Sequence, residues 1–284
     1  MNIRNNLINS KSYKFKETDH YWYNNLIFEF KGFSNKREES LNSNQIYLGL
    51  TRESLIFLND LNLVNSKINP NFVIFASRHR SEAQRPAFLA HLTGNWSNKA
   101  EFGGNPRELS LASALLFKAG FLSLLENSKS TILTNFSTDM EVTHHGPTTL
   151  KKPLIFMELG STKDEWSIDE AGEVVANSII NTIYKYLDFK KKKIQYIGLG
   201  FGGTHYAPNF QRLVINKNIA ISFICPKYYI QELNRDLVTQ MIENTLESVD
   251  YFIIDWKGTN SEDKKHLIPL LEEFDIPIKK TKDF

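Results

Sequence analysis

Short apolar runs alternate with amphipathic stretches along most of the chain. Four of these runs, at residues 72–76, 154–159, 194–199 and 251–254, end abruptly in glycine, histidine or charged residues. They are apolar at nearly every position instead of at alternate ones, which is typical of strands that are buried on both faces. The pattern therefore predicts four interior strands of one sheet.

Helical periodicity lies between the runs. Residues 165–187 carry apolar side chains at steps of three and four, and Thr162 with Glu165 forms a capping-box spacing in front of them. Residues 109–126 are apolar with few breakers and predict a second helix. Two later helices are expected, the first capped by Asn234 and the last capped by Ser261, with Pro269 kinking or interrupting the last one.

The alternation of strands and helices predicts an α/β fold whose central sheet is mostly parallel or mixed. The first seventy residues are polar, with plausible strands only at 25–30 and 45–50. Neither an internal repeat nor a linker follows residue 72. We therefore expect a single domain over residues 1–284, in which residues 1–70 form an N-terminal part of different character and residues 71–284 form the core with the motifs.

Composition excludes several classes of protein. Aromatic residues make up 12% of the 284 residues and the net charge is only +2, so the chain is not a disordered or non-specific nucleic-acid-binding tail. A single cysteine excludes a disulfide framework and a thiolate-rich metal cluster. Residues 1–10 are too polar for a signal peptide, and no apolar run is long enough for a membrane helix. We expect a cytoplasmic protein with no membrane contact.

Histidines gather in the turn-like segments beside the predicted strands. His79 and His205 follow two strands, and Glu158 and Asp255 stand at the ends of two others. Ligand sites of open α/β sheets form beyond the carboxyl ends of strands, so these side chains are expected to share one rim. Imidazoles and carboxylates without cysteine suit zinc in an open, catalytic coordination. The alternative is that each histidine is a hydrogen-bonded structural residue.

Two further features of this rim can be read from the local sequence. His144 and His145 are adjacent, so in extended chain they point to opposite sides and bind one ion together only if Gly146-Pro147 turns the backbone. Gly202 and Gly203 precede His205 and predict a tight turn that brings backbone close to a ligand. A dinucleotide-binding loop is disfavoured, because Pro208 follows these glycines where a long helix would have to begin.

Seven short motifs in one order carry a resemblance to a known family. They are FASRH (75–79), TGNW (93–96), THHGPT (143–148), ELGS (158–161), AGE (171–173), GGTHYAP (202–208) and DWKG (255–258). Together they resemble the archaeal and plant type of D-aminoacyl-tRNA deacylase. The resemblance extends from about residue 72 to the end of the chain.

This resemblance implies a zinc-dependent hydrolase that cleaves the ester between a D-amino acid and the 3′ end of tRNA. It also implies a three-layer α/β/α fold of the phosphorylase/hydrolase-like group and a monomeric state. Family members usually open with an apolar strand, whereas residues 1–10 are polar here, so this strand is expected to be missing or replaced.

The resemblance suggests roles for the site residues. His79, His145, Glu158 and His205 are the expected zinc-holding or zinc-orienting residues, and either His144 or Asp255 is expected to transfer a proton. The amides of Gly202 and Gly203 are candidates for stabilising the oxyanion. A metal-free mechanism, in which these imidazoles act as acid and base, stays open.

The tRNA end calls for stacking and cationic contacts. Trp96 and Tyr206 are the expected stacking residues for the terminal adenine, with Asn95 in the same turn as Trp96. Arg78 and Lys257 adjoin strand-end motifs and are expected to meet phosphates or the site. Two rivals remain, a zinc-dependent peptidase or amidohydrolase acting on a small substrate, and a non-catalytic RNA-binding protein with structural histidines.

Overall fold

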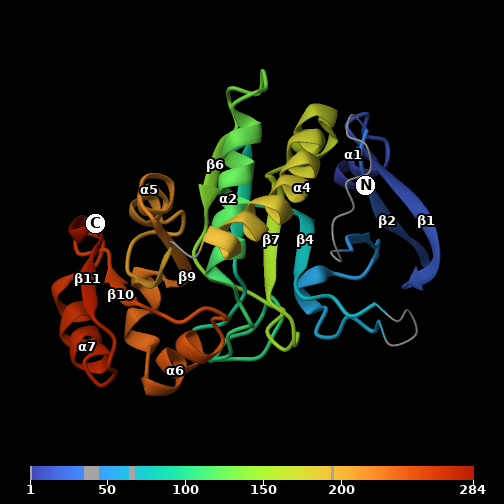
Figure 1. The fold of residues 1–284 in the computed structure, drawn as a ribbon. Coiled ribbons are helices and arrows are strands. Elements are labelled where there is room, and N and C mark those ends of the chain that lie inside the picture. Colours follow the sequence, from blue (N-terminus) through green and yellow to red (C-terminus); the bar gives the residue numbers. More distant parts are fainter. Residues whose placement is uncertain (1, 35–44, 64–67, 193–194) are drawn as a thin grey trace.

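The strands of the computed structural model form three sheets within the residues that it describes, which are 2–34, 45–63, 68–192 and 195–284 (Figure 1). The first is antiparallel and joins β1 (Tyr13–Trp22), β2 (Asn25–Phe33) and β3 (Tyr47–Leu48). It lies at the N-terminal edge of the molecule. Its aromatic side chains pack against one another, with the rings of Phe15 and Phe30 5.5 Å apart.

The second sheet is mixed and has the strand order β4-β7-β5-β6. These strands are β4 (Val73–Arg78), β5 (Ala87–His91), β6 (Ser137–Met140) and β7 (Leu154–Gly160). β4 runs parallel to β7 and β6 runs parallel to β5, but β5 runs antiparallel to β7. Residues 154–160 are all buried, as the continuous apolar run predicts.

The third sheet is parallel and has the order β11-β10-β8-β9. It consists of β8 (Tyr196–Phe201), β9 (Ile219–Cys225), β10 (Tyr251–Ile254) and β11 (Ile278–Lys280). The sheet therefore gathers the carboxyl ends of β8, β9 and β10 at one edge. The turns that follow these three strands hold much of the predicted site.

Seven α-helices and three short 3₁₀-helices cover the sheets in the described residues. The α-helices are α1 (Asn2–Ile8), α2 (Ala114–Ser128), α3 (Lys163–Ser167), α4 (Asp169–Lys192), α5 (Pro208–Asn216), α6 (Arg235–Glu243) and α7 (Ser261–Leu271). The 3₁₀-helices are η1 (Leu55–Phe57), η3 (Lys227–Glu232) and η4 (Thr281–Asp283). α2 packs beside α4 and contacts strands of both the mixed and the parallel sheet, so it joins the two (Figure 1).

The α/β class and the mixed and parallel sheets are confirmed. The predicted strands at 25–30, 45–50, 72–76, 154–159, 194–199 and 251–254 coincide with β2, β3, β4, β7, β8 and β10, although Ile194 lies outside the described residues. One group of buried side chains extends from Leu7 in α1 to Leu271 in α7. The single-domain organisation stays a prediction.

Helix boundaries differ from the predicted ones for local reasons. α2 begins at Ala114, five residues later than predicted, because the Ser113 hydroxyl caps it by accepting from the Leu116 amide. Residues 165–187 divide into α3 and α4 because Ile168 between them is extended, with ψ 113°. The capping box of Thr162 and Glu165 is confirmed, at the start of α3.

The predicted caps of the two later helices have different outcomes. Asn234 caps α6 as predicted, its side chain accepting from the Leu237 amide. The cap of α7 is Asn260, one residue before the predicted Ser261. Pro269 does not interrupt this helix, which ends two residues later at Leu271. A proline so close to the helix end removes only a hydrogen bond of the last turn.

Residues 2–8 form a helix where the family resemblance implied a missing or replaced strand. The Asn2 amide of α1 donates to the carbonyl of Ile168 at 2.6 Å, just before α4 begins. A Cβ at Gly172 would lie 2.0 Å from the Asn2 side chain, so glycine is required for this close approach. α1 therefore replaces the expected strand and packs on α4.

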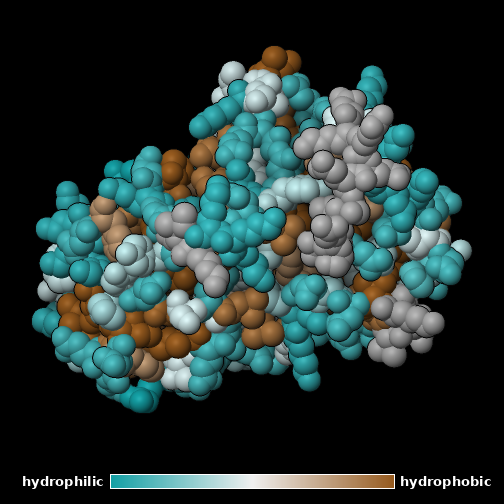
Figure 2. Space-filling model, in the orientation of Figure 1, coloured by the Kyte–Doolittle hydropathy of each residue, from teal (hydrophilic) through white to brown (hydrophobic). Residues whose placement is uncertain are grey.

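The surface is mostly hydrophilic on the face in Figure 2, with hydrophobic side chains gathered over the C-terminal elements at the lower left. No helix among the described ranges combines the length and the apolar character needed to cross a bilayer.

Candidate active site

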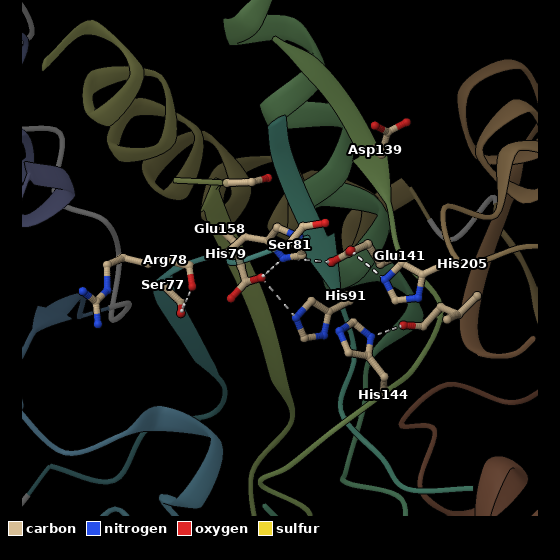
Figure 3. A network of polar contacts seen from close by, with 12 residues as sticks. Ser77, Arg78, His79, Ser81, His91, Asp139, Glu141, His144, Glu158 and His205 are labelled. Atoms are coloured by element: carbon tan, nitrogen blue, oxygen red, sulfur yellow. Dashed lines mark hydrogen bonds and ion pairs between the residues drawn. The ribbon is translucent and has the colours of Figure 1, made fainter. Parts of the chain in front are cut away.

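Seven titratable side chains from separate segments meet between the mixed and the parallel sheet. Figure 3 shows most of them pointing toward one another beside β5 and β7. The set, which we call the imidazole cluster, consists of His79, His91, Glu141, His144, His145, Glu158 and His205.

The parallel pairing of β4 and β7 places His79 beside Glu158. Ser77 is opposite Glu158 in the ladder, and the His79 amide extends it by donating to the Leu159 carbonyl at 2.9 Å. The His79 ring points toward β7, and its Nδ1 lies 3.1 Å from Glu158 Oε2. His79 follows the end of β4, where the apolar run predicted a strand.

The antiparallel pairing of β5 and β7 places His91 on the same carboxylate. His91 is opposite Phe156, and Phe156 and Glu158 share one face of β7 because side chains alternate along a strand. The His91 and Phe156 rings stack at 4.9 Å, and His91 Nε2 lies 3.7 Å from Glu158 Oε2. Glu158 therefore faces two imidazoles.

The segment after β6 joins the two sheets and carries Glu141. The Val142 amide donates to the His205 carbonyl at 2.9 Å, and the Thr143 amide donates to the Ile224 carbonyl at 3.1 Å. Glu141 Oε1 accepts from His205 Nε2 at 2.9 Å, while its Oε2 lies 3.9 Å from His79 Nδ1. The buried Glu141 carboxylate thus lies between histidines that belong to different sheets.

His144 and His145 both point into the cluster. Their rings are 4.5 Å apart, and each lies within 4.7 Å of the His91 ring. The expectation that they point to opposite sides in extended chain does not apply, because His145 is left-handed with φ +44° and turns the backbone before Gly146. One ion is therefore within reach of both imidazoles.

Hydrogen bonding fixes the tautomer of four of the imidazoles. Nδ1 of His91, His144 and His145 bonds to a backbone carbonyl, which only accepts, so each of these nitrogens carries the proton. Nδ1 of His79 bonds to the Glu158 carboxylate. Nε2 of these rings is left with its lone pair, as in histidines that bind metal.

The cluster offers ligand atoms for a metal in three overlapping groups. Within each group the atoms lie within 4.8 Å of one another, and the groups are His91–His144–His145, Glu141–His144–His205 and His79–Glu141–Glu158. His79 Nε2, His91 Nε2 and Glu141 Oε2 are buried without a hydrogen-bond partner in the described structure. Buried polar atoms of this kind are costly unless something binds them, so the donor set fits a metal ion.

The imidazoles of the cluster fall into two classes, those whose pKa is raised and those whose pKa is lowered. Burial lowers the pKa of His79 and of His91, but Glu158, which is hydrogen-bonded to His79 and 3.7 Å from His91, and the Glu141 charge outweigh burial and raise both pKa values. Burial and the neighbouring imidazoles lower the pKa of His144 well below its ordinary value. The same causes lower the pKa of His145 to about 4. The pKa of Glu158 is held well below its ordinary range, because the hydrogen bond from His79 and the neighbouring His91 and His145 imidazoles outweigh its burial.

Acid destabilises the metal-free protein through His145. Its folded-state pKa of about 4 lies below the unfolded value of 6.5, so the unfolded chain binds more protons between these pH values. The free energy of unfolding therefore falls on acidification from pH 6.5 to 4, by at most about 3 kcal/mol for this group.

Urea denaturation in the presence of chelator should show that acidification lowers the free energy of unfolding less for His145→Gln than for wild type. His20→Gln, at a half-buried strand position outside the cluster, should behave as wild type; equal acid loss in all three proteins contradicts the prediction.

The four predicted zinc-holding residues all belong to the cluster, but they are not one ligand group. His145, His205 and the pair His79–Glu158 fall into three different groups, which are linked by Glu141 and His144. His91 and Glu141, which were not predicted as ligands, belong to these groups as well.

Asp255, Gly202 and Gly203 do not join the cluster. Asp255 is buried after β10, where its carboxylate accepts from Asn209 Nδ2 at 2.7 Å and from the Gly258 amide at 3.2 Å. Gly202 and Gly203 form the predicted turn with φ +92° and +81°. Their amides already donate to the carbonyls of Cys225 and Gly258, so neither N–H is available to an oxyanion. These residues shape the turn that presents His205.

Two predicted substrate contacts lie in the interior. Trp96 is 1% exposed, and its indole N–H donates to the Thr143 carbonyl at 2.7 Å. It cannot stack on adenine, and it supports the segment that carries His144. Asn95 is buried too, and its amide donates to the carbonyls of Gly103 and Asn105.

The remaining predicted contacts lie around the cluster. Tyr206 is half-buried, with its ring 5.3 Å from His205 and the Arg85 guanidinium 4.4 Å above it. Arg78 is exposed over Trp166 and points away from the cluster (Figure 3). Lys257 is exposed and lines a hollow beyond His205.

Glu141 is the functional candidate that sequence reasoning missed altogether. It follows β6, whose sequence STDM has no apolar run, so no strand end is visible there. The only available signal is its position three residues before the histidine pair. His91 ends β5, a strand that the sequence pattern did not predict, so no role was given to this histidine.

The α/β scaffold and this histidine–carboxylate centre define an enzyme of hydrolytic type with donors for a metal. Residues 66–279 match the family model described as D-aminoacyl-tRNA deacylase. The chain belongs to this family, as the motifs indicated.

Curated relatives and a solved structure match most of the chain. D-aminoacyl-tRNA deacylase of Thermococcus onnurineus is 32% identical over 97% of this chain and 93% of its own length. The enzyme of the same name from Methanocaldococcus jannaschii is 36% identical over 71% of this chain and 79% of its own. A crystal structure titled as a conserved protein of unknown function is 30% identical, with a TM-score of 0.81, covering 99% of this chain and 91% of that one.

Proposed function

We propose that this protein hydrolyses the ester between a D-amino acid and the 3′ end of tRNA, releasing the free amino acid and reusable tRNA. The observation that carries the proposal is the convergence of five imidazoles from four segments on two buried carboxylates. The family membership and the names of the relatives supply the substrate class.

The cluster has groups suited to ester hydrolysis. An aminoacyl ester is already activated, so the enzyme must orient a water, remove its proton and stabilise negative charge. His144 is the proposed proton acceptor, because its lowered pKa keeps it neutral near pH 7 and its Nδ1–H is held by the Val142 carbonyl. His205, with a side chain that is 38% exposed, lies on the solvent side and is oriented by Glu141.

Zinc is the proposed cofactor. His79, His91, Glu141, His145, Glu158 and His205 are the residues that would hold it, whereas His144 keeps its Nε2 lone pair for the proton, and the number of ions is open. When bound, zinc polarises a carbonyl and lowers the pKa of a bound water to about 7. The buried Nε2 atoms of His79 and His91 support this assignment, since a hydrogen-bonded structural role would leave them partnered.

The tRNA end is proposed to enter from the side of His205. Tyr206 can stack on a base there, and Lys257 and Arg78 are the cationic residues proposed to meet phosphates. A cytoplasmic, monomeric enzyme follows from this substrate and from the resemblance, and both properties stay predictions.

The decisive experiment compares D-tyrosyl-tRNA with L-tyrosyl-tRNA as substrates of the wild-type protein. Release of D-tyrosine at a rate at least about tenfold above that of L-tyrosine supports the proposal. A peptidase or amidohydrolase of small substrates would spare both esters and cleave dipeptides. Hydrolysis of neither ester overturns the proposed function.

A further inference from the structure

A hollow of about 360 Å³ opens next to the imidazole cluster. It is lined by Lys227, Tyr228, Lys257, Gly258, Asn260 and Asp263, which come from the segments after β9 and β10 and from the start of α7. The same carboxyl-end edge of the parallel sheet therefore carries both the cluster residue His205 and this hollow. Its volume lies at the lower end of the range for ligand pockets, roughly 300–1,000 Å³.

Tyr228 connects the hollow to the cluster. Its hydroxyl lies 3.2 Å from His205 Nδ1, and the opposite nitrogen of the same ring bonds to Glu141. The backbone amide of Lys227 donates to the Gly203 carbonyl at 3.0 Å, which fixes the segment beside the turn that presents His205. A group bound in the hollow is thus adjacent to an ester held at His205.

The charge available in the hollow is positive. Lys227 and Lys257 are exposed, and neither ammonium has an ion pair or a hydrogen-bond partner in the described part of the chain. The one carboxylate in the lining, Asp263, is buried and accepts from Gln231 Nε2 at 2.8 Å. Glu262, also in the first turn of α7, pairs with Lys265 at 2.8 Å. The N-terminus of this eleven-residue helix adds positive potential.

We propose that this hollow binds a phosphodiester of the tRNA acceptor end, with Lys227 and Lys257 contacting its oxygens beside Tyr228. The inference rests on the proposed function and deepens it, because it names the part of tRNA that distinguishes the substrate from a simple amino-acid ester. Two unpaired ammonium groups around a small hollow suit a compact anion, and point charges of this kind are common phosphate ligands.

The test uses two D-esters that share the reacting bond. D-tyrosyl-tRNA carries phosphates, whereas 3′-O-D-tyrosyl-adenosine carries none. The double variant Lys227→Met/Lys257→Met should lower the ratio of kcat/KM for the tRNA ester to kcat/KM for the adenosine ester by about tenfold. The slope of log kcat/KM for D-tyrosyl-tRNA against log salt should also become shallower by about 0.7, the contribution of one single-strand phosphate, because both lysines contact the same phosphodiester.

Lys129→Met/Lys190→Met is the matched control, because it removes the same charge from exposed positions outside the hollow. Its ratio and its salt slope should equal those of wild type. If Lys227→Met/Lys257→Met has the same kcat/KM ratio and the same salt slope as this control, the phosphate subsite is overturned and the deacylase proposal is left intact. Cleavage of neither ester by wild type would instead overturn the proposed function and, with it, the subsite.

Discussion

Glu141→Gln is expected to lower kcat/KM for D-aminoacyl-tRNA by about 10²- to 10⁴-fold, the range for removing a group that orients or moves a proton. The carboxylate bonds to His205 at 2.9 Å, and its other oxygen faces His79 without a hydrogen-bond partner in the described structure. The amide keeps the shape but removes the charge and turns one acceptor into a donor. His205 then loses the group that orients it, and two ligand groups lose an anionic oxygen.

Asp139→Asn is the matched control for this prediction. Asp139 stands two residues earlier, at the end of β6, and its carboxylate pairs with Arg85 at 2.6 Å, outside the imidazole cluster (Figure 3). The control should retain the wild-type rate within about threefold, as for a surface ion pair. If Glu141→Gln hydrolyses the ester as fast as the control, the contacts of Glu141 with His205 and His79 have a structural role only.

Removal of metal is expected to have an effect of the same size. Dialysis against a chelator should reduce D-tyrosyl-tRNA hydrolysis by at least about 10²-fold, and added zinc should restore it. The buried Nε2 atoms of His79 and His91 then lack the metal ion that is proposed to bind them. Bound zinc per chain is measured in parallel by elemental analysis.

His91→Phe gives this prediction a readout other than rate. The ring still stacks on Phe156, but a ligand of one group is lost, so the variant should retain less zinc through dialysis than wild type. Chelator-resistant hydrolysis would leave the reaction standing and assign acid and base roles to the imidazoles alone. Equal zinc content in wild type and His91→Phe would remove His91 from the metal site.

The sequence predicted best the elements whose burial is uniform. β7 is buried at every position and its run of apolar residues is visible directly. β6 is one of the two edge strands of the mixed sheet, and its polar sequence STDM gives no comparable signal. Glu141 was missed for the same reason, because a strand end that is invisible in the sequence hides the residue behind it.

The histidines were predictable as a group, but their partners were not. Motif position placed His79, His145 and His205 at one site, whereas the division of ligands depends on the antiparallel pairing of β5 with β7. Trp96 looked like a stacking residue, but a contact with Thr143, 47 positions away, determines that it is buried. Contacts at such separation leave no periodic pattern in the sequence.

A double variant tests most directly whether side chains from separate segments act as one catalytic unit. Residues that act as a unit are strongly non-additive, because removing one already removes the function of the others. Single-turnover release of D-tyrosine from D-tyrosyl-tRNA is measured for Glu141→Gln, His144→Ala and the double variant. We expect the double variant to release D-tyrosine about as slowly as the slower of the two single variants. A double variant whose rate falls by the product of the two single effects would show that the two residues act independently.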